Sequence, residues 1–324
     1  MWKIKRRIIH LYMRGSNIIS KVNYMICNII GGNIWRFETN PYIMVFIDGG
    51  MASQIARATL GKQFEEKGFR VKYQIDFFKE KGYDMCHEES RDYILDICFP
   101  DSNVEIASYN EIKHYKLFYD YESGKHGTIE SIDKWDINRP IYFSGYSSDF
   151  LMDINRCPDF FKLDEIKPLL YKNAINYYQI IIDNRDKDII NVGVHVRRGD
   201  MTLTGFYWKV LTGKYFVEAI RRLKESTSSR ICLFFFSNGF DFVQEEIIPF
   251  IDNTGIILVD KNEHEYEDFF LLCKCDVQIE SQGSWGRLAY IYNENPNKRL
   301  VTYKGIIDDK TIVIDLTEDM YIDS

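Results

Sequence analysis

The chain has 324 residues, of which 45% are hydrophobic, and its formal net charge is −7. This length is ample for a packed core and favours two domains over one. The acidic balance, with an isoelectric point near 5.5, argues against a nucleic-acid-binding protein, whose surface is usually basic. The aromatic share of 15% suits carbohydrate handling but does not establish it.

Residues 1–36 carry seven basic side chains and no acidic one, with apolar residues at close to helical spacing. No stretch of 18 or more residues is free of charges and amides, so we expect no membrane-spanning helix. No apolar core leads to a small-residue cleavage site, so a signal peptide fits poorly. Two interpretations of this basic amphipathic segment (1–40) stay open. It either lies on the inner face of the cytoplasmic membrane or packs on the protein as an extra helix.

A first α/β domain is predicted over residues 41–185. A strand, a Gly-Gly turn, a helix and a second strand follow one another, and this order predicts a parallel sheet. The predicted elements are a strand over 42–47, a helix over 52–67, a strand over 70–75, irregular helices and loops over 79–139, a strand over 141–143 and a connecting helix over 164–184.

A second α/β domain, of the doubly wound kind, is predicted over residues 186–324. Apolar runs of strand length alternate with segments of helical periodicity. The predicted strands span 189–196, 231–236, 256–259, 277–279 and 299–302, and the predicted helices span 214–225, 241–250, 266–274 and 285–292.

The strongest motif follows the first strand of this second domain, where Arg197 and Arg198 precede Gly199 and Asp200. Ligands of open α/β sheets bind beyond the carboxyl ends of the strands. Two guanidinium groups at that place can offer paired donors to a phosphate. The alternative is an arginine pair bound to acidic loops on the surface.

Three other strand-to-helix junctions carry small polar residues or glycines, which suit phosphate or sugar contacts. They contain Gly49, Gly50 and Gln54, then Ser237 and Asn238, and finally Ser281 and Ser284. The alternative for each is local: a plain turn for the glycines, and helix capping for the serines and the asparagine.

Other chemistries find less support in the sequence. The Asp-x-Asp sequence of metal-dependent sugar transferases is absent, and the loose acidic run Asp183, Asp186 and Asp188 is typical of a solvated turn. The seven cysteines are odd in number and include no Cys-x-x-Cys pair, and the single residue between Cys273 and Cys275 is poor zinc spacing. Because most of them lie in apolar runs, we expect buried free thiols and a cytoplasmic protein.

These landmarks resemble motifs of the bacterial α-1,2-fucosyltransferases and of the wider α-1,2/α-1,6/protein-O fucosyltransferase superfamily. The family's His-x-Arg-Arg-Gly-Asp motif matches residues 195–200 at every position. Its Gly-Gly-Leu-Gly-Asn-Gln motif is similar to residues 49–54, with three of six positions kept. Its Phe-Ser-Asp-Asp element resembles residues 236–239 without the two acids, and its late Asn-Ser-x-Phe-Ser-Trp-Trp stretch resembles residues 280–286, where Glu280 replaces Asn.

The resemblance implies two Rossmann-like domains facing across a cleft, the GT-B arrangement, with the acceptor on the side of 41–185 and the GDP-sugar on that of 186–324. It implies GDP-fucose as donor, inversion at the anomeric carbon, no metal and no cofactor. It also implies a galactose-ended, lipid-linked oligosaccharide as acceptor, as in bacterial surface polysaccharides such as O-antigen. The departures leave another linkage, another nucleotide sugar or a non-catalytic binding protein open.

The resemblance implies a role for each of the motif residues. We expect Arg197 to contact the β-phosphate, Arg198 to support phosphate or sugar, and His195 and Asp200 to orient the arginines. Nucleotide or fucose contacts are expected from Ser237, Asn238, Ser281 and Ser284, and cleft contacts near the acceptor from Gly49, Gly50 and Gln54. The acceptor proton would go to Asp48 or to the departing phosphate.

Overall fold

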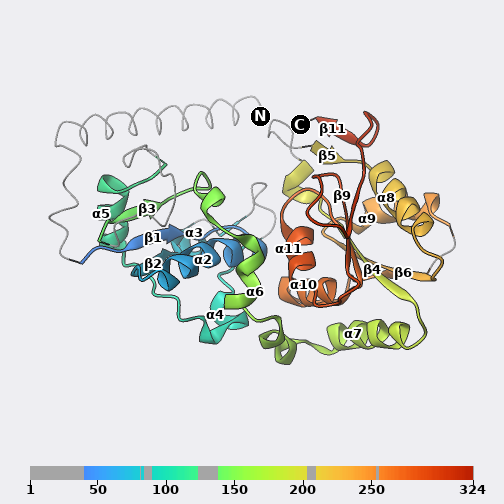
Figure 1. Ribbon diagram of the computed structural model, residues 1–324, viewed down its shortest axis with the longest axis horizontal. Coiled ribbons are helices and arrows are strands. Elements are labelled where there is room, and N and C mark those ends of the chain that lie inside the picture. Colours follow the sequence, from blue (N-terminus) through green and yellow to red (C-terminus); the bar gives the residue numbers. More distant parts are fainter. Residues whose placement is uncertain are drawn as a thin grey trace. The chain divides into compact units, whose positions relative to one another are not determined.

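The computed structural model describes residues 40–80, 82–83, 90–122, 138–202, 209–252 and 255–323. The predicted N-terminal segment (1–40) therefore lies almost wholly outside the described residues. The chain divides into two compact units, and each has a parallel sheet of its own (Figure 1). The predicted α/β class with two such domains is confirmed.

The first unit has a sheet of three parallel strands in the order β2-β1-β3. The strands are β1 (Ile43–Phe46), β2 (Val71–Gln74) and β3 (Ile141–Phe143), close to their predicted positions. Helix α2 (Met51–Glu66) follows β1 as expected, and α3 (Asp76–Glu80) and α5 (Tyr109–Phe118) complete the unit. The central strand β1 is almost entirely buried, which explains its unbroken apolar sequence.

The second unit has a sheet of six parallel strands in the order β10-β9-β8-β4-β6-β7. The strands are β4 (Ile190–Val196), β6 (Ile231–Ser237), β7 (Gly255–Leu258), β8 (Val277–Ile279), β9 (Arg299–Thr302) and β10 (Thr311–Val313). Strands β4 and β6 are nearly continuous hydrophobic runs because helices cover both faces of the sheet.

Helices α8 (Gly213–Glu225) and α9 (Phe240–Glu246) pack on one face of this sheet (Figure 1). Helix α10 (Glu265–Lys274) contacts α7 (Lys172–Arg185) and α11 (Trp285–Tyr292), and all three contact strands of the sheet. Gly193 marks how closely α10 approaches, because a Cβ there would lie 2.4 Å from a methyl carbon of Leu272. The alternation of strands and helices predicted for this half is confirmed.

Proline explains the two helices that are shorter than predicted. Residues 163–169 form 3₁₀ turns around Pro168, so α7 begins at Lys172 and not near 164. Helix α9 ends at Glu246, because Pro249 lies in a separate 3₁₀ turn over 248–250. The antiparallel pair of β5 (Lys209–Leu211) with β11 (Tyr321–Asp323), and the edge strand β10, have no counterpart among the predicted elements.

The division between the units differs from the predicted boundary at 185/186. The second unit takes in everything from Asn155 onward, together with residues 49–53 and the described part of 82–102, which contains α4 (Leu95–Cys98). Helix α7 belongs to it because Ala174 and Ile181 are buried and the helix packs on α10 and β4.

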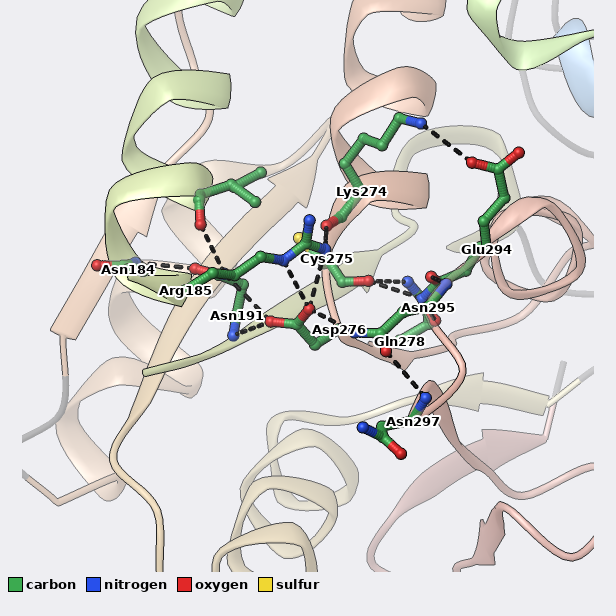
Figure 2. Close-up of polar contacts among 12 residues, drawn as sticks. Asn184, Arg185, Asn191, Lys274, Cys275, Asp276, Gln278, Glu294, Asn295 and Asn297 are labelled. Atoms are coloured by element: carbon green, nitrogen blue, oxygen red, sulfur yellow. Dashed lines mark hydrogen bonds and ion pairs between the residues drawn. The ribbon is translucent and has the colours of Figure 1, made fainter. Parts of the chain in front are cut away.

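The amino edge of the second sheet, where its strands begin, is held by the carboxylate of Asp276. This carboxylate accepts hydrogen bonds from the main-chain N–H of Asn191 (2.8 Å), from Nε of Arg185 (2.9 Å) and from Nδ2 of Asn295 (2.8 Å), as Figure 2 shows. The network joins α7, β4, β8 and the loop after α11, and it explains why the acidic residue sits beside buried strands.

The expectation of buried free thiols is confirmed for Cys98, Cys157, Cys232, Cys273 and Cys275. Cys27 and Cys86 lie outside the described residues. Within the described ranges, no helix combines the length and apolar character needed to cross a membrane.

Candidate functional site

The carboxyl edge of the second sheet, where β4, β6, β8 and β9 end, gathers most of the residues singled out in the sequence. Parallel strands bring their carboxyl ends to one edge, which is where ligands of such sheets bind. Hydrogen bonds and ring contacts connect the predicted site residues His195, Arg197, Arg198, Asp200, Ser237, Asn238 and Ser281 at this edge.

Arg197 is held in place on both sides of its main chain. Its N–H donates to Oγ of Ser281 (3.1 Å), and its carbonyl oxygen accepts from Nε2 of Gln282 (2.9 Å). The guanidinium donates to Asp200 at 2.5 Å, and the Arg197 side chain is 21% exposed. A cation fixed in this way can meet an anion from solvent without first losing much conformational entropy.

Arg198 has different partners, so the two guanidinium groups do not form one symmetric fork. Its N–H donates to Oδ1 of Asn238 (2.8 Å), and its NH1 donates to the carbonyl oxygen of Leu211 (3.0 Å). Its guanidinium carbon lies 3.9 Å from the centre of the Phe242 ring, a stacking arrangement that arginine favours. Burial lowers the pKa of Arg198. Arg198 thus joins β4 to β5 and α9.

The capping interpretation of the polar junctions is wrong at both helices. Ser237 donates to the carbonyl oxygen of Val196 (2.8 Å) and accepts from the N–H of Gly239 (2.9 Å). The N-cap of α9 is Gly239, which has no side chain to cap with, and Ser284, at the N-cap of α11, makes no side-chain capping bond. Ser237 instead joins the end of β6 to the end of β4, and Ser284 is exposed.

His195 is buried in β4 and acts through its neighbours. Its Nδ1 lies 3.3 Å from Oγ of Ser281, and its ring centre is 5.1 Å from that of Trp285. Burial, with the nearby charges of Arg197 and Lys304, lowers the pKa of His195 to about 3. The imidazole is therefore neutral at pH 7 and can serve as an uncharged support beneath Ser281.

Two residues near the carboxyl ends of β8 and β9 were not predicted from the sequence. Gln282 is 2% exposed, and its Oε1 has no hydrogen-bond partner within the part of the chain that the structure describes. Lys304, just after β9, donates to the carbonyl oxygens of Ser281 (2.9 Å) and Gly283 (2.5 Å). The only available signal was position, since Gln282 follows Ser281 and Lys304 follows a predicted strand.

Glu280 stands where the fucosyltransferase motif has an asparagine, and its side chain points into the protein interior. Its carboxylate is fully buried and accepts two hydrogen bonds from Arg287, at 2.8 and 3.3 Å, and one from the hydroxyl of Thr302. Its carbonyl oxygen accepts from the hydroxyl of Tyr215 (2.7 Å). The charge that this substitution adds is therefore matched inside the fold and is not presented at the edge.

The remaining predicted residues lie at the carboxyl end of β1. Gly49 has a φ of +71°, a conformation that favours glycine, and Gly50 directly precedes α2. Gln54 is fully buried on α2, and Asp48 accepts a hydrogen bond from the hydroxyl of Tyr146. Among the described residues, no group of three His, Cys, Asp or Glu side chains could hold a metal ion.

Comparison with solved structures gives distant similarities. The fucosyltransferase NodZ from Bradyrhizobium is 12% identical, with 78% of this chain and 93% of that one covered and a TM-score of 0.42. POFUT1 in complex with GDP is 9% identical, covering 79% and 96%, with a TM-score of 0.37. The E. coli ADP-heptose LPS heptosyltransferase II is 10% identical, covering 86% and 91%, with a TM-score of 0.37.

No curated protein matches the chain. The family model described as glycosyl transferase family 11 matches residues 109–311. This match takes in the whole carboxyl edge described above and spans more than half of the sequence, so the chain belongs to glycosyl transferase family 11.

Proposed function

We propose that this family 11 protein transfers fucose from GDP-fucose to a galactose-type hydroxyl of a glycan, forming an α-1,2 linkage with inversion and without a metal ion. The observation that carries the proposal is Arg197, whose main chain is hydrogen-bonded on both sides while its side chain stays 21% exposed. A fixed guanidinium at the carboxyl ends of parallel strands suits the phosphates of a nucleotide.

In the proposed reaction, the bond between the anomeric carbon and the β-phosphate oxygen breaks, and its electron pair stays on the phosphate. The acceptor oxygen bonds to the anomeric carbon from the opposite face and loses its proton to Asp48 or to the departing phosphate. Negative charge grows on the phosphate, and a preorganised cation stabilises that charge most when it need not move. Arg197 would supply this stabilisation, with a charge-assisted hydrogen bond contributing roughly 1.5–3 kcal/mol.

The other residues support this role in the proposal. Asp200 orients the Arg197 side chain through their 2.5 Å contact, and His195 supports Ser281 beneath it. Arg198 supports phosphate or sugar mainly by positioning, since one of its nitrogens is bonded to Leu211. Ser237, Asn238, Ser281 and Ser284 remain proposed nucleotide or fucose contacts, and Gly49, Gly50 and Gln54 remain proposed acceptor-side residues.

Two alternatives to the proposed fucosyl transfer must be distinguished from it. Ser237 is followed by Asn238 and Gly239, where the Phe-Ser-Asp-Asp element of the fucosyltransferases has two acidic residues. This change favours either another nucleotide sugar or linkage, or a protein that holds a nucleotide without turning it over. The acceptor we propose is a galactose-ended, lipid-linked oligosaccharide, and contact of residues 1–36 with the membrane stays a prediction.

Calorimetric titration with GDP, UDP, ADP and GDP-fucose tests the donor. We expect wild-type protein to prefer the two guanine nucleotides and Arg197→Ala to lose that binding. Arg222→Ala is the matched control, because Arg222 is an exposed arginine of α8 bonded to Glu218. Preference for UDP or ADP would exclude GDP-fucose as donor, and equal binding by Arg197→Ala would exclude the proposed phosphate contact.

An assay of fucose transfer from GDP-fucose to galactose-ended acceptors then separates enzyme from binding protein. Release of GDP with formation of a fucosylated product supports the transferase, and analysis of the product gives the linkage. GDP binding without turnover on any galactose-ended acceptor would favour the binding protein.

A further inference from the structure

Lys304 lies two residues beyond the end of β9 and holds the loop that follows β8. Its ammonium group donates to the carbonyl oxygens of Ser281 (2.9 Å) and Gly283 (2.5 Å) and lies 3.7 Å from the carboxylate of Glu280. Gly283 has a φ of +90°, a left-handed conformation, and the turn around it brings both carbonyl oxygens to one cation.

The same loop holds Arg197. Ser281 accepts the N–H of Arg197, and Gln282 donates to its carbonyl oxygen. Two successive residues of the loop therefore fix the main chain of Arg197, and the carbonyl oxygens on either side of Gln282 are bonded to Lys304. Lys304 therefore adds a further fixed point to a glycine-containing turn that is also bonded to Arg197 and, through Ser281, to His195.

A buried charge explains why the ammonium group stays at this place. The Glu280 carboxylate is fully buried between Arg287 and Lys304, and a carboxylate without cations would be costly in such a position. Glu280, the residue before the 281–283 loop, thus holds the Lys304 ammonium beside this loop. The three charged side chains form one unit at the end of β8 and β9.

We propose that Lys304 is a positioning residue of the donor site: it fixes the 281–283 loop, which in turn fixes the main chain of Arg197. The inference rests on the proposed function for its catalytic consequence. Its structural part concerns the ligand-free protein. Lys304 touches neither donor nor acceptor in this proposal and acts through Ser281 and Gln282.

The test compares Lys304→Met, which removes the ammonium but keeps the length of the side chain, with Lys304→Arg, which keeps a cation. Misplacement of a catalytic group by about 1 Å costs about a hundredfold in rate. We expect a fall of about tenfold to a hundredfold in kcat for Lys304→Met, a smaller change in the KM for GDP-fucose, and recovery of most activity in Lys304→Arg.

Lys298→Met is the matched control. The Lys298 ammonium also donates to two main-chain carbonyl oxygens, those of Tyr290 (2.9 Å) and Ile291 (3.5 Å), but at the opposite end of α11. We expect this variant to keep wild-type kcat. Should Lys304→Met fail to fold, Lys304→Gln takes its place, because its amide keeps one donor for a loop carbonyl.

Hydrogen exchange of the Arg197 amide in ligand-free protein gives a readout independent of activity. We expect exchange at Arg197 to rise by about tenfold or more in Lys304→Met and to stay unchanged in Lys298→Met. Unchanged exchange in Lys304→Met overturns the inference even if activity falls. If wild-type protein transfers no fucose, the proposed function fails, and Arg197 exchange still decides whether Lys304 positions this loop.

Discussion

The two edges of the second sheet use polar side chains in opposite ways. At the amino edge, a cavity of about 640 Å³ is lined by Arg185, Lys298, Arg299 and Lys310, among others. Each of these cations is bonded to the protein itself, for example Arg185 to Asp276 and Arg299 to Ser226. At the carboxyl edge, the Arg197 guanidinium is likewise bonded, to Asp200 at 2.5 Å, whereas the buried Oε1 of Gln282 has no partner among the described residues.

The difference between the two edges therefore lies in this amide oxygen and not in the pairing of their cations. A ligand gains little from donors and acceptors that are already satisfied, because every new hydrogen bond then replaces an existing one. At the amino edge, charged side chains bond to one another and to the main chain, and these bonds join α7, β4 and β8. At the carboxyl edge, Oε1 of Gln282 can still accept a hydrogen bond. Variants at the two edges should therefore separate stability from activity.

The largest expected effect is that of Arg197→Lys at the carboxyl edge. Lysine keeps the charge but loses the planar fork that meets a phosphate with two donors. We expect kcat/KM for fucose transfer to fall by about a hundredfold to a thousandfold, as when one preorganised donor to a developing oxyanion is removed. Steady-state kinetics measures the loss, and a melting temperature close to wild type shows that the edge is not needed for stability. Near-normal turnover would remove Arg197 from the mechanism.

The next largest effect is expected at the amino edge, where a substitution should lower stability and leave nucleotide binding unchanged. Asp276→Ala leaves the N–H of Asn191 and Nε of Arg185 without their acceptor, and we expect a loss of about 2–4 kcal/mol in the free energy of unfolding. Urea denaturation measures it, with Asp309→Ala, an exposed residue lining the same cavity, as control. GDP affinity of the folded variant should match wild type. A variant of normal stability that had lost GDP binding would reverse the contrast between the edges.

A smaller effect per pH unit concerns the buried His195. Its pKa of about 3 lies below the value near 6.5 expected for the unfolded chain, so the unfolded state binds the extra proton between these two values. Stability should therefore fall as the pH drops from about 6.5 towards 3, by up to about 1.4 kcal/mol per pH unit from this group. Denaturation curves at several pH values measure the slope, which His195→Gln should reduce. His114→Gln, at an exposed histidine of α5, is the matched substitution at the surface.

The smallest effect is expected at Ser284, which is exposed and caps no helix. Ser284→Ala should change the melting temperature very little, since the Ser284 side chain makes no capping bond to α11. If Ser284 contacts the donor as proposed, affinity for GDP-fucose should fall by about threefold to tenfold, the effect of one neutral hydrogen bond of roughly 0.5–1.5 kcal/mol. Calorimetry on the variant checks this, and unchanged affinity would exclude Ser284 from the donor site.

Local pattern was enough for the second sheet and for the place of its site. The apolar runs ending at Val196, Phe236, Ile279 and Thr302 identify parallel strands, and the polar residues that follow each run necessarily meet at one edge. Their detailed bonding was not predictable. The capping interpretation of Ser237 and Ser281 relied on sequence neighbours, whereas both side chains bond to β4, about 40 and 85 residues away along the chain.

The sequence by itself determined the α/β class, most strands and helices, the buried cysteines and the arginine edge, because hydrophobic periodicity and strand ends are local properties. The tertiary structure decided the rest. It placed α7 in the second unit, paired β5 with β11, turned Glu280 inward and brought Gln282 and Lys304 to Arg197. These are contacts between residues far apart in the chain, and only the packing of the sheet with its helices specifies which distant groups satisfy one another.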